Sequence, residues 1–170
     1  AVISSTGSAT ITLIGTASVD GVFITDAGSQ VTSVTGAISI IGNSTTAEGV
    51  NIEDGAAVIS TGTALISING TANTASASDG VEIDGGSITS GAGDILITGL
   101  SSGDDGIDLE NGGVVTSTGA ASITINGTTT GVNGSDSEGI SIEGADTQIS
   151  SSGGSISLTG IASGGTAGDG

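Results

Sequence analysis

The stretch DGVEIDGGSITSGAGDILITG, residues 79–99, contains three short apolar segments separated by glycines, serines and acids. Its apolar residues alternate with polar ones, as in Val81/Ile83 and Ile95/Ile97. This is the two-residue period of a strand rather than the 3.6-residue period of a helix. An acid and a glycine directly precede the first segment. The stretch therefore predicts three short strands joined by tight corners.

The same pattern recurs along the chain and starts each time with an acid, a glycine and a valine or isoleucine. The steps are Asp20-Gly21-Val22, Glu48-Gly49-Val50, Asp79-Gly80-Val81, Asp105-Gly106-Ile107 and Glu138-Gly139-Ile140, and the acid-glycine pair returns at Asp169-Gly170. The repeats are 28, 31, 26 and 33 residues long, and a period of about 20 to 50 residues is typical of repeat architectures. We expect a single array over residues 1–170, cut from a longer one.

Two further strands are expected in each repeat. The second is centred on Val31, Val58, Ile88, Val115 and Ile149. The third contains Ile38/Ile40, Ile66/Ile68, Ile95/Ile97, Ile123/Ile125 and Ile156/Leu158, each closed by a glycine. The distance from the first strand to the third is nearly constant, whereas the segment from the third strand to the next repeat varies in length. Insertions are accepted at the surface, so two tight corners and one tolerant corner predict a triangular coil.

We therefore expect an all-β fold, a right-handed parallel β-helix (β-solenoid) with three strands per coil and about five to six coils. Files of isoleucine and valine would fill the interior, because β-branched side chains suit a pleated buried surface. Glycines would occupy the corners, where a positive φ costs them little. Irregular repeat length favours the right-handed form over a left-handed helix of strict hexapeptides.

Composition limits the possible partners. The net charge is −18, and the chain has no lysine, arginine, histidine or cysteine. Binding to nucleic acid through neutralised phosphates, or to anionic lipid through basic residues, is therefore excluded. No apolar run approaches the roughly 18 residues of a membrane helix, so we expect no membrane insertion. Counter-ions for the acids must come from solution.

The acids fall into files when the repeats are aligned. Two residues before the first-strand valine or isoleucine stand Asp20, Glu48, Asp79, Asp105, Glu138 and Asp169. Three residues after it stand Glu53, Asp84, Glu110 and Glu143, and one residue after it Glu82 and Asp108 face outward. Stacked coils would bring like charges to about 4.8 Å, where they repel or raise each other's pKa.

Two explanations of these files are open. The functional hypothesis is a ladder of divalent cations, with Ca²⁺ as the expected ion, because hard cations prefer carboxylate and carbonyl oxygens and no soft or imidazole ligand is present. The alternative is that acid-glycine is good turn chemistry and that solvent screens the charge. No EF-hand loop and no G-G-x-G-x-D repeat occurs in the sequence.

Catalysis is not expected. The paired carboxylates Asp104/Asp105 or Glu53/Asp54 could in principle cleave a glycosidic bond. The chain, however, offers no histidine as a general base, no cationic stabiliser and no cysteine nucleophile.

A structural role remains: a rod whose ends are unpaired strand edges, able to continue into further repeats or to associate end to end as a filament. The alternative is a ligand-binding solenoid surface, such as a calcium-dependent surface-layer, glycan-binding or ice-binding module. Outward hydroxyls of the third strand, such as Thr10/Thr12 and Ser122/Thr124, support the ice-binding variant, and Leu96 interrupts their row. No residue identifies a receptor.

The glycine-spaced runs ITSGAGDILITG, STGAASITINGT and SSSGGSISLTG resemble the repeat regions of large bacterial surface and secreted proteins. Examples are filamentous-haemagglutinin-like adhesins, autotransporter passenger domains and giant cell-surface repeat proteins. The resemblance implies an extracellular stalk or fibre, at the cell surface or secreted. It carries over no binding residue.

Overall fold

The computed structural model describes residues 1–74, 77–131 and 137–163, which form seventeen strands in three parallel sheets. Sheet A contains β1 (Val2–Ser5), β4 (Gln30–Ser33), β7 (Ala57–Ser60), β10 (Ser87–Ser90), β13 (Val114–Ser117) and β16 (Gln148–Ser151). Sheet B contains β2 (Ile11–Ala17), β5 (Ile38–Ser44), β8 (Ile66–Ala72), β11 (Ile95–Ser101), β14 (Ile123–Thr129) and β17 (Ile156–Ala162). Sheet C contains β3 (Val22–Ile24), β6 (Val50–Glu53), β9 (Val81–Asp84), β12 (Ile107–Glu110) and β15 (Ile140–Ile142). Among these residues no helix could cross a membrane.

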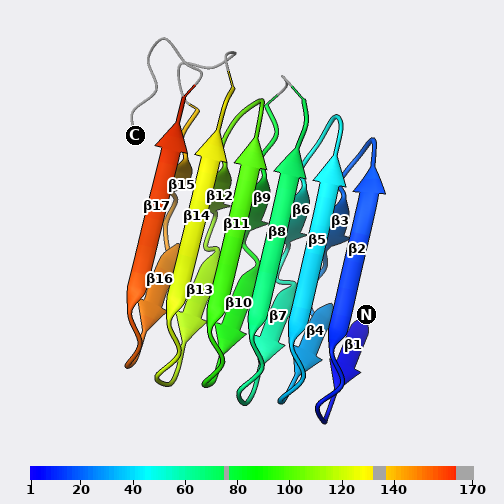
Figure 1. Ribbon diagram of the computed structural model, residues 1–170, viewed down its shortest axis with the longest axis vertical. Helices are drawn as coiled ribbons and strands as arrows, with labels where there is room; N and C mark the ends of the chain where they lie inside the picture. The colour runs from blue at the N-terminus through cyan, green and yellow to red at the C-terminus, as the bar shows by residue number, and fades with distance from the viewer. Residues whose placement is uncertain (75–76, 132–136, 164–170) are drawn as a thin grey trace.

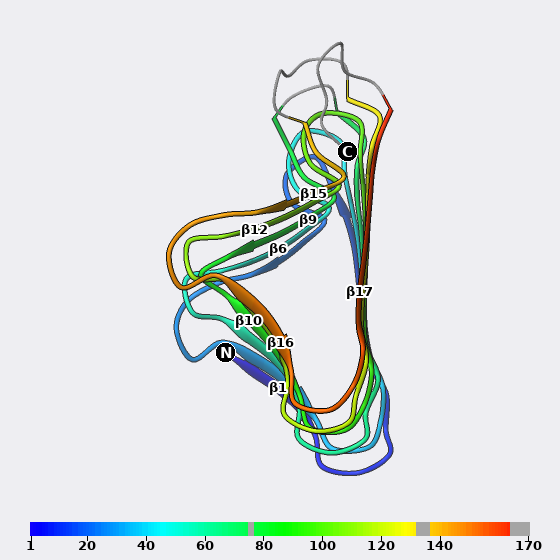
Figure 2. The ribbon, with the colours of Figure 1, turned by 90° about the vertical axis from the view of Figure 1, so that its left-hand side faces the viewer.

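The chain winds as a right-handed β-solenoid. After β1 and β2 it passes five times through sheet C, sheet A and sheet B in that order. The six strands of sheet B stand side by side in Figure 1. Viewed along the axis with the C-terminal coil in front, the chain ascends sheet B, crosses into sheet C and returns through sheet A (Figure 2). The all-β fold and the three strands per coil are as the sequence predicts.

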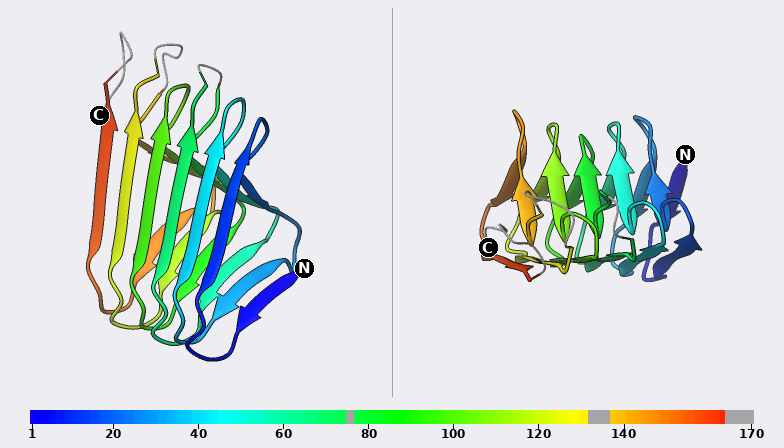
Figure 3. Two further views of the ribbon diagram at one scale, coloured as in Figure 1. Left: turned by 45° about the vertical axis from the view of Figure 1, so that its right-hand side comes forward. Right: turned by 90° about the horizontal axis from the view of Figure 1, so that it is seen from above.

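The core consists of aliphatic side chains stacked from coil to coil. Neighbouring strands pair in parallel with equivalent residues opposite each other, for example Ile66 with Ile95 and Ile95 with Ile123. The alternate positions predicted to face inward are buried in the central coils and form one continuous cluster. Figure 3 shows the three sheets that enclose this cluster.

The glycines at the corner from sheet B to sheet C have a different role from the one predicted. β11 does not close at Gly99 but continues to Ser101. A Cβ on Gly99 would overlap the carbonyl oxygen of Gly106, and a Cβ on Gly106 would overlap the backbone beside Gly127 in the next coil. Neither glycine has a positive φ. Glycine is required here because two backbone segments touch, and not because the chain turns through a left-handed conformation.

The left-handed conformation does occur at the corner from sheet C to sheet A. Among the described residues, the glycines with positive φ are Gly28, Gly55, Gly85, Gly112 and Gly144, all at this corner. Asp54 and Asn111 also adopt positive φ there, as short polar side chains tolerate. The predicted positive φ of the corner glycines is therefore confirmed at the corner from sheet C to sheet A. At the corner from sheet B to sheet C, glycine is required by a close backbone contact instead.

The corner from sheet A to sheet B explains the recurring serine and glycine after the second strand. The last residue of each strand in sheet A is a serine, and Ser33 and Ser117 are buried. Ser33 Oγ donates a hydrogen bond to the carbonyl of Gly36 at 2.5 Å, and Ser90 Oγ donates to Gly93. These bonds satisfy the carbonyls of the turn inside the coil, where water is excluded.

Candidate cation site

The acids that precede sheet C lie at the corner from sheet B, where loops bulge toward the outward side of sheet C (Figure 2). Asp79 and Asp105 are 9% and 7% exposed. Asp79 Oδ1 accepts the backbone N–H of Asp105 at 2.9 Å, and Asp105 Oδ1 accepts that of Glu138 at 2.6 Å. One carboxylate oxygen of each residue thus binds the backbone of the next coil, and not a backbone group of its own turn as the turn-chemistry explanation requires.

The outward face of sheet C carries a second row of side chains, which are polar from the second strand onward. In register order from β3 to β15 this row is Phe23, Asn51, Glu82, Asp108 and Ser141. Residues paired across parallel strands project to the same face, so these side chains are neighbours. Asn51 is only 5% exposed, and Glu82 and Asp108 are half-buried. The central part of the row, from Asn51 to Asp108, is therefore largely withdrawn from solvent although it faces outward, whereas Phe23 is 50% exposed.

The two files meet in the third coil. Asp79, Glu82 and Asp108 each offer a carboxylate oxygen, and the three oxygens lie within 4.8 Å of one another. Asp79 comes from the loop before β9, Glu82 from β9 and Asp108 from β12. Oxygens at this separation can share one cation, since Ca²⁺–oxygen distances are about 2.3–2.6 Å.

Electrostatics show how unfavourable this arrangement is without a cation. Burial, together with neighbouring carboxylates, raises the pKa of Asp79 to about 8 and that of Glu82 to about 8. Burial first, and then the charge of Glu110, raises the pKa of Asp108 to about 6. The sequence has no lysine, arginine or histidine that could neutralise these groups. Without a cation, Asp79 and Glu82 therefore hold protons at neutral pH, whereas Asp108 is mostly ionised.

The neighbouring coils hold smaller groups. Burial and a hydrogen bond with Asp20 raise the pKa of Glu48 to about 7, and burial raises that of Asp105 to about 7. The positions equivalent to Asp79, Glu82 and Asp108 hold Glu48, Asn51 and Glu82 one coil earlier. One coil later they hold Asp105, Asp108 and Ser141. Each of these sets has only two carboxylates. Within the described residues, three carboxylates converge in the third coil alone.

The acids three residues after the first-strand valine or isoleucine form a separate file at the ends of the strands of sheet C. Glu53 pairs with Asp84, and Asp84 with Glu110. Thr25 Oγ1 donates to Glu53 Oε1 at 3.2 Å, and burial raises the pKa of Glu110. Most of the predicted metal ligands do not belong to the three-carboxylate cluster; these are Asp20, Glu48, Asp105, Glu138, Glu53, Asp84, Glu110 and Glu143. Asp169, in the same file as Asp79, lies outside the described residues.

The sequence places Glu82 and Asp108 on the outward face, but it gives no reason to join them to Asp79. The cluster could have been found by combining three positions of the repeat. One acid stands two residues before the first-strand valine, and another stands one residue after it. The third stands one residue after the first-strand isoleucine of the next repeat. Asp79, Glu82 and Asp108 meet this condition. The loop must also return over the sheet, which periodicity does not reveal.

The arrangement can bind a hard cation or protons. The candidate pair Asp104/Asp105 adjoins the cluster, and one oxygen of Asp105 is already occupied by the N–H of Glu138. Comparison with known proteins finds no match among protein families, curated proteins or solved structures.

Proposed function

We propose that this chain is a segment of an extracellular structural rod, whose ends are covered by further coils of the same kind. The observation that carries the proposal is the open N-terminal end of the solenoid. An apolar hollow there is lined by Ile3 of β1, Leu13 of β2 and Val22 of β3. The hollow also borders β3, whose outer edge is free. Sheet C has five strands, whereas sheets A and B each have six. One more strand of sheet C would fill the hollow.

The C-terminal end is complementary in pattern. Leu158 of β17 is 45% exposed, although the equivalent Ile125 one coil earlier is buried. β17 belongs to the same file as β2 through continuous register, so both ends present matching rows of aliphatic residues. An interface that joins two different faces produces an open filament when its rotation does not close a ring, and coils stacked along one axis meet this condition.

The cellular setting of the proposal comes from the sequence. The resemblance to repeat regions of bacterial adhesins and filaments supports a cell-surface or secreted location. The absence of lysine and arginine removes every trypsin-type cleavage site, which suits a protein outside the cell. We propose no catalytic role, because the chain supplies neither a histidine base nor a cationic stabiliser.

A ligand-binding surface is the second candidate. Sheet B is flat in the axial view (Figure 2), and its outward row Thr12, Ser39, Ser67, Leu96, Thr124 and Ser157 carries five hydroxyls. A flat hydroxyl row suits a glycan or an ordered water layer. Electron microscopy separates the two candidates, because a rod segment gives long uniform fibres and a ligand-binding module gives dispersed short particles.

The open end can be tested directly by extending the chain. Val2 pairs with Gln30, so Ala1 corresponds to Ser29, and a copy of residues 20–28 (DGVFITDAG) placed before Ala1 would add one sheet-C strand in register. Burial of its valine and isoleucine should raise the melting temperature by several degrees, since each contributes about 1.5–3 kcal/mol.

The matched control carries the same extension with serine in place of that valine and isoleucine, and it should melt like the parent chain. Equal melting temperatures for both extended chains would show that the end does not accept another coil, and the proposal would be wrong. All of these measurements are made in chelator, so that they do not depend on any metal.

A further inference from the structure

Two buried oxygens distinguish the cluster in the third coil from an ordinary group of surface acids. In the part of the chain that the structure describes, the buried side-chain atoms without a hydrogen-bond partner are Asn51 Oδ1 and Asp108 Oδ1. Both belong to the outward row of sheet C, and both residues pair in register with Glu82, one from each side. Unpartnered buried acceptors are rare in folded proteins, so their coincidence at one place requires an explanation.

Asn51 adjoins the cluster in the register of sheet C, and its amide oxygen has no hydrogen-bond partner. Asn51 Nδ2 donates to Glu53 Oε2 at 3.4 Å, and Glu53 lies two residues further along β6. The amide oxygen is the other polar atom of the amide, and Asn51 pairs in register with Glu82 of the cluster. Asn51 has already used its amide group, and ionised carboxylates only accept hydrogen bonds, so no group of the ionised cluster can donate to this oxygen.

We propose that Asp79, Glu82 and Asp108, together with the amide oxygen of Asn51, bind one Ca²⁺ ion. Three carboxylates and an amide carbonyl are all hard oxygen ligands, and the unpartnered oxygens of Asn51 and Asp108 supply acceptors that nothing else in the chain satisfies. Ca²⁺ accepts six to eight oxygens in irregular geometry, with water completing the shell. Mg²⁺ requires a near-ideal octahedron and suits this site less well.

The proposal is narrower than a ladder of cations along the solenoid. The equivalent three positions hold Asp20, Phe23 and Asn51 in the first full coil and Asp105, Asp108 and Ser141 in the fourth. Neither set has three carboxylates. The expected stoichiometry is therefore one tight Ca²⁺ per chain and not one per coil. The inference does not depend on the rod proposed above, because the cluster lies within the central coils.

The test is isothermal titration of the full chain, stripped of metal with chelator, with CaCl₂ and separately with MgCl₂ at neutral pH and physiological ionic strength. We expect one saturable Ca²⁺ site and much weaker binding of Mg²⁺. Glu82→Gln should weaken Ca²⁺ binding about tenfold or more, because it removes a charged ligand at the centre of the cluster. Asp108→Asn, which keeps the shape of the side chain, should have a similar effect.

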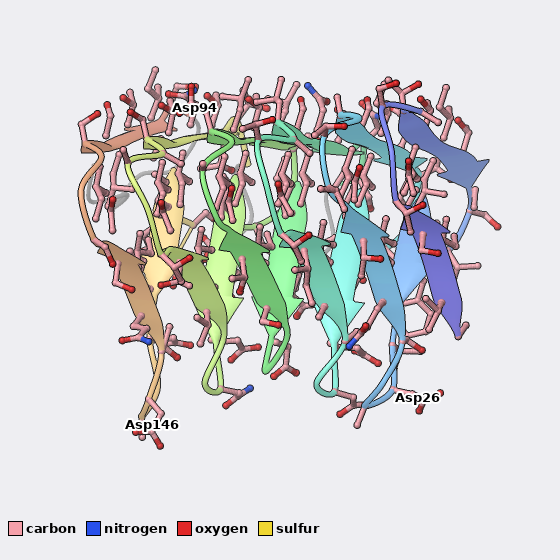
Figure 4. All side chains as sticks on the ribbon, turned by 90° about the horizontal axis from the view of Figure 1, so that it is seen from below. Asp26, Asp94 and Asp146 are labelled. Carbon is pink, nitrogen blue, oxygen red and sulfur yellow. The ribbon has the colours of Figure 1, made fainter. Side chains whose placement is uncertain are left out.

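Asp146→Asn is the matched control. Asp146 is exposed at the tip of a corner between sheets C and A, far from the cluster in sequence and in register (Figure 4). The substitution removes the same unit charge and should leave the affinity unchanged. Asn51→Asp provides the opposite change, since it adds a charge beside Glu82 and should tighten Ca²⁺ binding.

Circular dichroism verifies that each variant is folded before its affinity is interpreted. Absence of saturable Ca²⁺ binding by the parent chain would overturn the proposal, as would equal weakening by Glu82→Gln and Asp146→Asn, which would indicate diffuse screening. Equal affinity for Mg²⁺ would overturn the assignment to calcium. Unchanged or weaker binding by Asn51→Asp would exclude Asn51 as a ligand.

Discussion

The two faces of sheet C respond in opposite ways to the same stacking. On the inward face, Ile83 lies between Ile52 and Leu109, and all three side chains are buried in an apolar file. On the outward face, one residue away along each strand, Glu82 lies between Asn51 and Asp108. Register that aligns isoleucines on one side aligns carboxylates on the other. The parallel stacking of coils therefore repeats the unfavourable contact between carboxylates as well as the favourable contact between isoleucines.

The difference shows which interactions can be supplied from within the chain. Aliphatic neighbours satisfy one another through burial and dispersion. Buried carboxylates cannot satisfy one another, and a chain without cationic side chains leaves their compensation to protons or metal ions. The outward face of sheet C is thus the part of the central coils whose stability should depend on the solution, whereas the inward face should be insensitive to it.

The largest expected effect comes from breaking the register that both faces share. Gly99→Ala places a Cβ against the backbone of Gly106, and relief requires the backbone of β11 or the following corner to move. We expect a loss of about 4 kcal/mol or more, or failure of the central coils to fold. Urea denaturation followed by circular dichroism measures the change.

Gly7→Ala serves as the control for this substitution. A Cβ on Gly7 meets nothing within 4 Å, and Gly7 has no positive φ. Its stability should stay within about 0.5 kcal/mol of the parent chain. A tolerated Gly99→Ala would show that the backbone contact at this corner is not a requirement of the fold.

The second prediction removes one member of the inward file. Ile83→Ala should cost about 2–5 kcal/mol, because the cavity between Ile52 and Leu109 cannot close without moving neighbouring coils. Thr124→Ala, on the outward side of β14, should change the stability by about 0.5 kcal/mol or less. Denaturation midpoints in chelator at one pH measure both variants. Similar losses for the two would contradict the assignment of inner and outer faces.

The inward files could be predicted from sequence because each position repeats with the coil. Val81/Ile83 and Ile95/Ile97 fix the strand period, and their recurrence fixes parallel stacking. The joining of Asp79 to Glu82 could not be predicted, because it depends on how a loop of irregular length returns over sheet C. Gly99 illustrates the same limit: the sequence shows that glycine recurs, but only packing distinguishes a backbone contact from a positive φ.

The third prediction concerns pH and the outward face. The pKa of Asp79 is about 8 in the folded chain against an ordinary value of 3.8, so the folded state binds more protons between these values. Its contribution to the free energy of unfolding is therefore fully present below about pH 4 and is lost as the pH rises to about 8. The loss is about 1.4 kcal/mol per pH unit for one such group.

Thermal melting of the metal-free chain from about pH 5 to 8 checks this sign, and saturating Ca²⁺ should reduce the slope. A melting temperature that rises with pH in chelator would show that the carboxylates are not withdrawn from water. In the Ile83→Ala variant the melting temperature should change with pH as it does in the parent, because the substitution lies on the inward face.

The last prediction concerns Glu82→Gln without metal, and the size of its effect depends on pH. Glutamine imitates the protonated glutamate, and burial raises the pKa of Glu82 to about 8. The variant should match the parent chain near pH 4 and be more stable by about 1 kcal/mol or more near pH 6, because Glu82 ionises above pH 4.5 in the unfolded chain but keeps its proton in the folded chain until about pH 8. Asp146→Asn should stay within about 0.5 kcal/mol at both values. If Glu82 is a ligand, Ca²⁺ stabilises the parent chain more than the variant, so the parent should become the more stable chain once Ca²⁺ is added near pH 9. A glutamine variant that stays more stable than the parent in Ca²⁺ would show that the electrostatic penalty at Glu82 is separate from metal binding.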